Sequence, residues 1–219
     1  MSVSTPVMGQ QPRSAGWRWR RRLSMLQDAT LVVVSALFFY FQARHVAVDH
    51  SLSAVGFAVE QGILVVLFLT RRRSNVTSTR PWDWLIAAGG AWGPLAVRAQ
   101  GDSALAAELI GVAVQFAGLA LVAVFFTFLG RSFGIVAANR GLKTAGPYRF
   151  VRHPIYLAHT VTLIGFVIAN WHPYNLAVLV VVTTCQVLRT LAEERVLTES
   201  TDYAAYKARV RWRLVPGVF

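Results

Sequence analysis

Acidic residues are scarce in this chain, and charged residues of both signs are few. Only 15% of its 219 residues are charged, with 10 Asp and Glu against 22 Lys and Arg, whereas a soluble domain usually carries about 25%. Hydrophobic residues make up 55% of the sequence. So little charge excludes an ordinary soluble domain, and we expect an integral membrane protein.

Cysteine is almost absent as well. The single residue, Cys185, lies in an apolar run, which excludes a disulfide framework and a site built from several thiolates. The histidines His45, His50 and His172 have no carboxylate or cysteine partner at ligand spacing. We therefore expect no metal site.

Long apolar runs are abundant, in contrast, and six of them approach a membrane span in length, which takes about 20 residues in a helix. The third run is the weakest because Gly89, Gly90, Gly93 and Pro94 interrupt it, and such small residues are typical of close helix packing. The fifth and sixth runs are short and tightly joined, which predicts a helical hairpin. The sequence therefore predicts an all-α, polytopic membrane protein with five to six transmembrane helices. The runs comprise residues 26–43, 54–70, 82–97, 105–130, 153–170 and 175–191.

Basic residues are concentrated on one side of these runs. Twenty of the 22 lie in the two tails and in the second and fourth connections, and the other two are Arg44 and Arg98. The positive-inside rule then places both termini and the 130–152 loop in the cytoplasm. We expect this charge to set the topology and to attract anionic membrane lipids. Because it is spread over several membrane-side segments, we expect no binding to nucleic acid.

Three regions follow from this organisation. They are a basic cytoplasmic tail at 1–25, N-terminal transmembrane helices at 26–129, and a C-terminal region at 130–219 with a loop, the hairpin and an amphipathic tail. No small-residue cleavage pattern follows the basic tail, so we expect no cleaved signal peptide. Tyr203 and Tyr206 in the amphipathic tail suit the lipid headgroup region. The oligomeric state stays open.

A polar motif precedes the fifth run, with Gly-Pro-Tyr-Arg at 146–149 and Arg-His-Pro at 152–154. Gly-Pro indicates a turn, and Pro154 suits the first position of a helix, where its missing N–H has no cost. A helix N-terminus beside Arg149, Arg152 and His153 is a site for an anion, such as the carboxylate of an amino-acid-like cofactor. A basic loop at the membrane interface would have the same composition.

A second polar motif closes the sixth run, with Arg189, Glu193 and Glu194. Arg189 and Glu193 share a helix face, either as a surface ion pair or as functional groups at the membrane boundary. His153 lies about 19 residues before the hairpin turn and Arg189 about 17 after it, so at about 1.5 Å per residue the two arms match within about 3 Å. We expect the two motifs to meet at one end of the hairpin.

Together these motifs resemble the isoprenylcysteine carboxyl methyltransferase family, whose members are integral membrane enzymes that use S-adenosylmethionine. The resemblance covers residues 130–219. It rests on Gly-Pro-Tyr-Arg-x-x-Arg-His-Pro-x-Tyr at 146–156, the hairpin, Arg-x-x-x-Glu-Glu at 189–194 and Tyr-x-x-Tyr at 203–206. It implies that 130–219 is the catalytic region, that the cofactor pocket is cytoplasmic, and that the protein is a bacterial-type member in the plasma membrane.

The resemblance also implies roles for individual residues. Arg189 would lie near the carboxylate of the acceptor. For the mechanism, we expect Arg189 to orient the acceptor and Glu193, the second catalytic residue, to be able to take a proton from an amine acceptor. One departure from the family is Arg140, near the position where members often have a histidine. The residues implied to line the S-adenosylmethionine pocket are Tyr148, Arg149, His153, Pro154, Tyr156, Glu193 and Glu194.

We expect the acceptor to be a lipophilic small molecule or lipidated group that enters from the bilayer and is methylated on a carboxylate. Phospholipid N-methyltransferases share a looser form of the motifs, so methylation of a phospholipid or amine is an alternative, as is a sterol-type reductase that uses NADPH. Outside enzymes, the alternative is a small transporter or scaffold, although transporters usually have broken helices in paired halves. Glu60 inside the second run is either functional or paired with a neighbouring span.

Overall fold

The computed structural model describes residues 16–49, 52–70, 76–78, 80–99, 103–132, 136, 138–139, 142–198 and 201–219. Within these residues the chain forms seven α-helices, three short 3-10 helices and one pair of two-residue strands, so the all-helical prediction is confirmed. The α-helices are α1 (Gly16–Asp49), α2 (Leu52–Thr70), α3 (Pro81–Trp92), α4 (Leu105–Leu129), α5 (Pro154–Ala169), α6 (Pro173–Leu197) and α7 (Thr201–Arg209). The short elements are β1 (Val76–Thr77), β2 (Ala138–Asn139), η1 (Gly93–Ala96), η2 (Gly130–Ser132) and η3 (Gly146–Arg149).

Proline marks where several of these helices begin. Pro81, Pro154 and Pro173 each stand at the first residues of a helix, where a missing N–H leaves no intrahelical bond unmade. Pro94 has the opposite effect, because it cannot donate to the helix before it, and the third apolar run is broken into α3 and η1. The predicted interruption of this run is confirmed. Helix α1 begins at Gly16, well before the first apolar run, since Arg and Leu are good helix formers.

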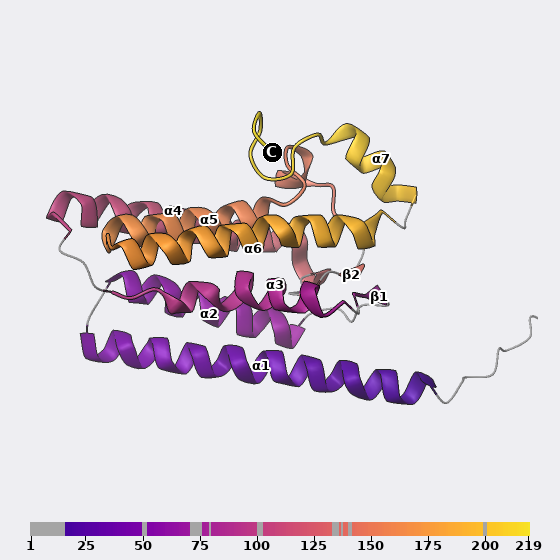
Figure 1. Cartoon of the computed structure of the whole chain (residues 1–219), viewed down its shortest axis with the longest axis horizontal. Helices are drawn as coiled ribbons and strands as arrows, with labels where there is room; N and C mark the ends of the chain where they lie inside the picture. The colour runs from indigo at the N-terminus through magenta and orange to yellow at the C-terminus, as the bar shows by residue number, and fades with distance from the viewer. Residues whose placement is uncertain are drawn as a thin grey trace, which may run out of the picture.

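The first six helices lie side by side and alternate in direction (Figure 1). The start of α1, the β1–β2 pair, α7 and the C-terminal segment all lie toward one end of this array. The two strands pair antiparallel, with Val76 opposite Asn139 and Thr77 opposite Ala138, and so join the α2–α3 and α4–α5 connections. This end therefore collects several polar segments of the part of the chain that the structure describes.

Two of the described helices, α4 and α6, are long and apolar enough to cross a membrane. Shorter apolar helical stretches occur at Val55–Leu67 and Pro154–Ala169. At about 1.5 Å per residue, the 16 residues of α5 extend about 24 Å, less than the ~30 Å of an average hydrocarbon core. The number of membrane spans thus stays a prediction.

Helices α4 and α5 approach each other through glycine. A Cβ on Gly165 of α5 would lie 2.2 Å from the backbone nitrogen of Gln115 on α4, and a Cβ on Gly118 would lie 2.5 Å from the nitrogen of Thr162. Neither position accommodates a side chain, because the neighbouring atoms are backbone. The absence of side chains lets the two helix backbones touch, which fixes α5 on α4.

Helix α6 packs on α3 in a similar way, as the Gly89–Gly93 cluster predicts. A Cβ on Gly90 would lie 2.8 Å from Cδ of Arg189, and one on Gly93 would lie 2.7 Å from Cγ2 of Val182. At the hairpin turn, the buried amide of Asn175 donates to the carbonyls of Asn170 and Arg98, at 2.8 and 2.9 Å. The hairpin is therefore tied to the η1 connection at its turn, while its arms rest on different partners.

Candidate functional site

The start of α5 is held by the C-terminal segment. The backbone N–H groups of Arg152 and His153 donate to the carbonyls of Trp212 and Arg213, both at 2.9 Å. Val151 and Trp212 form a parallel bridge beside them. Two segments some 60 residues apart thus fix the backbone immediately before Pro154, which is buried as the first residue of α5.

The end of α6 reaches this point with both of its glutamates. Nδ1 of His153 lies 3.7 Å from Oε2 of Glu193, and Nε2 of His153 lies 3.4 Å from Oε1 of Glu194. The prediction that the two motifs meet at one end of the hairpin is confirmed. The residues meet because α5 and α6 are of similar length between the turn and the motifs, as the sequence spacing indicates.

The two glutamates have different surroundings. Glu194 is buried, and its carboxylate lies 2.8 Å from Nη1 of Arg152 and 3.2 Å from Nε of Arg213. The side chain of Glu193 is 31% exposed and accepts a hydrogen bond of 2.8 Å from the Tyr156 hydroxyl. Glu194 is therefore neutralised within the protein, whereas Glu193 is the carboxylate accessible to a ligand.

Arg189 borders the same cluster from one turn earlier on α6. Its guanidinium carbon lies 4.7 Å from the centre of the Tyr156 ring, and the Tyr156 ring in turn stacks on His153 at 5.7 Å. Arg189 donates a 2.9 Å hydrogen bond to Gln186, which donates to the carbonyl of Gly90 at 3.0 Å. His153, Tyr156 and Arg189 therefore follow one another along the hairpin. The Arg189 guanidinium lies closer to the middle of the hairpin than the carboxylates of Glu193 and Glu194.

Tyr148 forms a wall of the cluster, while Arg149 does not. Tyr148 is buried in η3, and burial, with the nearby charge of Glu193, raises the pKa of its hydroxyl above the usual range. Its carbonyl accepts a 2.7 Å hydrogen bond from Tyr206 of α7. The Arg149 side chain is exposed, and none of the described contacts of the cluster includes it. Arg140 lies outside the described residues.

Helix α7 is placed differently from the sequence expectation. Tyr203 and Tyr206, expected among lipid headgroups, are 1% and 2% exposed and pack with Val210 and Leu142. Burial raises the pKa of Tyr206 to about 12, so it donates to Tyr148 at ordinary pH. The expectation is wrong for these two tyrosines because α7 packs its tyrosine face against Leu142 and Leu197 and Tyr206 donates to the Tyr148 carbonyl.

The sequence did not indicate two residues that make polar contacts in the structure, Arg213 and His159. Arg213 contacts Glu194 because the C-terminal segment folds back onto the start of α5. No local sequence pattern predicts this contact. Glu60 of α2 pairs with His159 of α5, 99 residues apart in the chain. His159 lies in an apolar run without a motif. Glu60 was indicated by the sequence as an intramembrane acid, and the structure shows the predicted alternative of a partner on a neighbouring helix.

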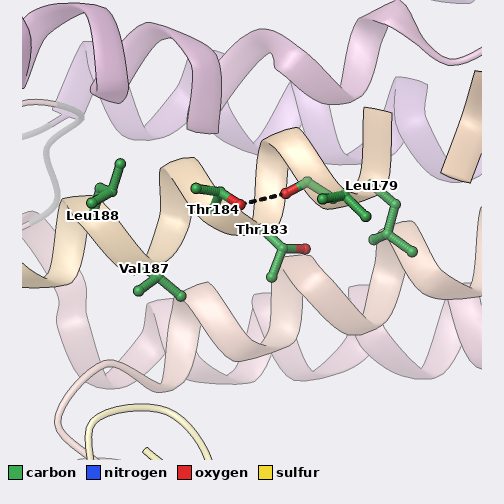
Figure 2. A pocket seen from close by; sticks show the side chains of 6 residues that line it. Leu179, Thr183, Thr184, Val187 and Leu188 are labelled. Atoms are coloured by element: carbon green, nitrogen blue, oxygen red, sulfur yellow. Dashed lines mark hydrogen bonds between the residues drawn. The ribbon is translucent and has the colours of Figure 1, made fainter. Parts of the chain in front are cut away.

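An apolar groove of about 360 Å³ follows the outer side of α6 (Figure 2). It is separate from the charged cluster. The hydroxyl of Thr184 donates to the carbonyl of Val180 at 2.8 Å, so this polar group is satisfied within its own helix and suits a hydrocarbon environment. The groove is lined by Leu179, Val180, Thr183, Thr184, Val187 and Leu188.

Residues 103–203 match the family model of phospholipid methyltransferases. The match runs from the start of α4 into α7 and includes His153, Tyr156, Arg189 and both glutamates, but not Arg213. The matched family is of the isoprenylcysteine carboxyl methyltransferase type. The match therefore supports the family type that the motifs resemble. With two helices able to cross a membrane, the match supports a membrane methyltransferase. A comparison with curated proteins gives no match.

Proposed function

We propose that this protein transfers a methyl group from S-adenosylmethionine to a lipophilic acceptor, and that the cofactor binds where α5 begins and α6 ends. The observation that carries the proposal is the convergence of His153, Tyr156 and Glu193 at this point. The match to a methyltransferase family over the same residues supports it.

The chemistry of the cluster fits an amino-acid-like cofactor. Glu193 offers a partly exposed carboxylate for the ammonium group. His153 and the N-terminus of α5 suit the cofactor carboxylate, and Glu194 lies 3.4 Å from Nε2 of His153. Tyr148 and Tyr156 supply aromatic walls, and Pro154 shapes the helix start. Glu194 holds Arg152 in place, and the bound cofactor would supply an electrophilic methyl group on sulfur.

Arg189 supports a carboxylate as the acceptor group. It is a buried cation on the membrane side of the cluster, and a guanidinium binds a carboxylate in a fixed orientation. A carboxylate is ionised at neutral pH and needs no base, so alignment with the methyl group would supply most of the rate enhancement.

An amine is the second candidate, because the matched family is described by phospholipid methylation. An amine acceptor has to lose a proton before it attacks, and Glu193 is one carboxylate that could take it. An amine acceptor predicts a methylated amine in the lipid fraction, whereas a carboxylate acceptor predicts a methyl ester.

The proposed topology has six spans, with both termini and the cofactor pocket in the cytoplasm. It is supported by the alternating helix directions (Figure 1) and by the bias of Lys and Arg toward one end. The cofactor then arrives from the cytoplasm, and the acceptor enters laterally from the bilayer of a bacterial plasma membrane.

The cofactor site is tested by calorimetry in detergent with wild type, His153→Ala and Glu193→Ala. We expect at least a tenfold weaker affinity for S-adenosylmethionine in each variant, because a charge-assisted contact contributes about 1.5–3 kcal/mol. Thr184→Val, on the outer face of α6, is the matched control and should bind as wild type does. Unchanged affinity in both site variants, or saturable binding of NADPH in place of S-adenosylmethionine, would refute the assignment.

The reaction is tested by incubating the protein with membrane extracts and cofactor labelled in its methyl group. We expect the label in the lipid or lipidated-protein fraction, released by mild base if it is a carboxyl ester and retained if it is an amine. Label in neither fraction would contradict methyl transfer.

A further inference from the structure

A second pair of ionisable residues lies deeper in the helix array than the cluster around His153 and Glu193. Nδ1 of His159 contacts Oε1 of Glu60, and the two side chains are 14% and 7% exposed. At about 1.5 Å per residue, His159 lies about 4.5 Å beyond Tyr156 along α5. The pair therefore sits between the cluster and the middle of the bilayer, where ionisable groups are costly and usually functional.

Few other charged groups lie near this pair. Helix α2 carries no other titratable residue, and the only one on α4 is Glu108, which is exposed and at the opposite end. Helix α4 presents the Phe126 ring to His159, with centroids 6.3 Å apart. The other titratable or charged side chains described on the helices around this pair are the exposed Tyr40 and Arg44 of α1, Tyr156 of α5, Asp83 of α3, and Cys185, Arg189 and Glu193 to Arg195 of α6. Of these, Tyr156 binds Glu193, and Asp83 binds Arg195.

The contact fixes the tautomer of the imidazole. A carboxylate only accepts hydrogen bonds, so Nδ1 of His159 donates to Glu60, and Nε2 of the neutral ring keeps its lone pair. A carboxylate that orients an imidazole in this way is the arrangement of a general base. The Phe126 ring beside His159 limits the access of water to it.

We propose that His159 is the general base that removes a proton from the acceptor, that Glu60 positions it, and that the acceptor is therefore a membrane amine. The inference rests on the proposed methyl transfer, and it favours the second acceptor candidate because a carboxylate needs no base. An ammonium loses one proton to Nε2 of His159. The nitrogen lone pair then forms the bond to the methyl carbon while the carbon–sulfur bond breaks, and its electron pair stays on sulfur. Arg189 supports this chemistry, since a nearby cation favours the neutral amine.

The activity test uses nanodiscs that contain phosphatidylethanolamine as the amine probe and N-acetyl-S-farnesylcysteine as the carboxylate probe. With labelled cofactor, we expect label in the amine probe and a fall in kcat of about 10²- to 10⁴-fold in His159→Gln. We expect a smaller fall in Glu60→Gln. Thr160→Val, one residue away on α5, is the control and should behave as wild type does.

The pH profile separates a base from a structural pair. In wild type, kcat/KM should fall on acidification, because a protonated base cannot accept the proton of the acceptor. In His159→Gln, the rate should instead rise with pH toward the region near 10 where a free alkyl amine titrates. An unchanged pH profile in His159→Gln, with only a lower unfolding temperature, would overturn the inference, as would label confined to the carboxylate probe.

A measurement without turnover tests the same assignment. In protein labelled with ¹⁵N-histidine, the signals lost in His159→Gln identify this ring among the five histidines. We expect its neutral form to carry the proton on Nδ1, and a proton on Nε2 would refute the base. Affinity for S-adenosylmethionine should be unchanged in His159→Gln. Failure of wild type to bind the cofactor would refute the proposed function instead, so the two failures are distinguishable.

Discussion

Adjacent glutamates at the end of α6 show how position decides what a charged residue does. Glu194 is buried and contacts Arg152 and Arg213, so its charge is compensated within the fold. Glu193 contacts Tyr156 and stays partly exposed. The same side chain thus serves once as a structural group and once as a group available to a ligand.

Removal of either arginine should destabilise the protein to different extents. Arg152→Met leaves Glu194 buried beside a nonpolar side chain, and we expect a loss of about 3–5 kcal/mol in the free energy of unfolding. Arg213 is 26% exposed, and Arg213→Met should cost about 1 kcal/mol. Denaturant unfolding in micelles measures both. Adding Glu194→Gln to Arg152→Met should recover part of the loss, and strictly additive losses would show that the pair is not coupled.

Alkaline stability should depend on Tyr206. Burial raises its pKa from 10.0 to about 12, so its contribution to stability is complete below pH 10 and is lost as pH rises through about 12. Tyr206→Phe leaves the Tyr148 carbonyl without this donor, and we expect a loss of about 1–3 kcal/mol at neutral pH and a shallower decline above pH 10. The control is Tyr174→Phe, an exposed tyrosine at the far end. If the free energy of unfolding fell equally with pH above 10 in wild type and Tyr206→Phe, the predicted role of Tyr206 would be contradicted.

At the scale of elements, each arm of the hairpin is positioned by a different neighbour. Helix α5 lies against α4 through Gly118 and Gly165, and α6 lies against α3 through Gly90. Their polar ends still meet, because both arms extend about equally far from a turn that Asn175 ties down. The site geometry therefore depends on two helix–helix contacts outside the hairpin.

Gly165→Ala should separate α4 from α5. The new Cβ would lie 2.2 Å from the nitrogen of Gln115 and 2.7 Å from the carbonyl oxygen of Gly111. Backbone atoms cannot move aside, so we expect a loss of about 1–3 kcal/mol and weaker cofactor binding. Gly62→Ala is the control, since its Cβ would meet only the Phe39 side chain at 3.4 Å. Equal unfolding temperatures for the two variants would be evidence against the close contact.

At the scale of the whole molecule, the fold gathers its polar segments at one end. Helices that alternate in direction place the β1–β2 pair, the α4–α5 connection and the C-terminal segment together (Figure 1). This arrangement suits the proposed reaction between a water-soluble cofactor and a membrane acceptor, because the proposed cofactor site lies at the polar end and the Glu60–His159 pair lies deeper.

Sidedness can be measured with single cysteines in a Cys185→Ser background. Thr144→Cys and Ala205→Cys lie at the polar end and should react with an impermeant maleimide only from the cytoplasmic side. Ala104→Cys, before α4, should react only from the opposite side. All three positions are exposed, so accessibility does not depend on unfolding. Labelling of all three from one side would refute the topology.

The sequence by itself determined the helical class, the hairpin and the meeting of His153 with Glu193, because these depend on local hydropathy and on a constant rise per residue. It also indicated Tyr148, Tyr156 and Arg189, although Arg149 proved exposed. Only the tertiary structure decided that Arg213 contacts Glu194 and that Glu60 pairs with His159. Such contacts join residues far apart in the chain through the packing of whole elements, and no local pattern records that packing.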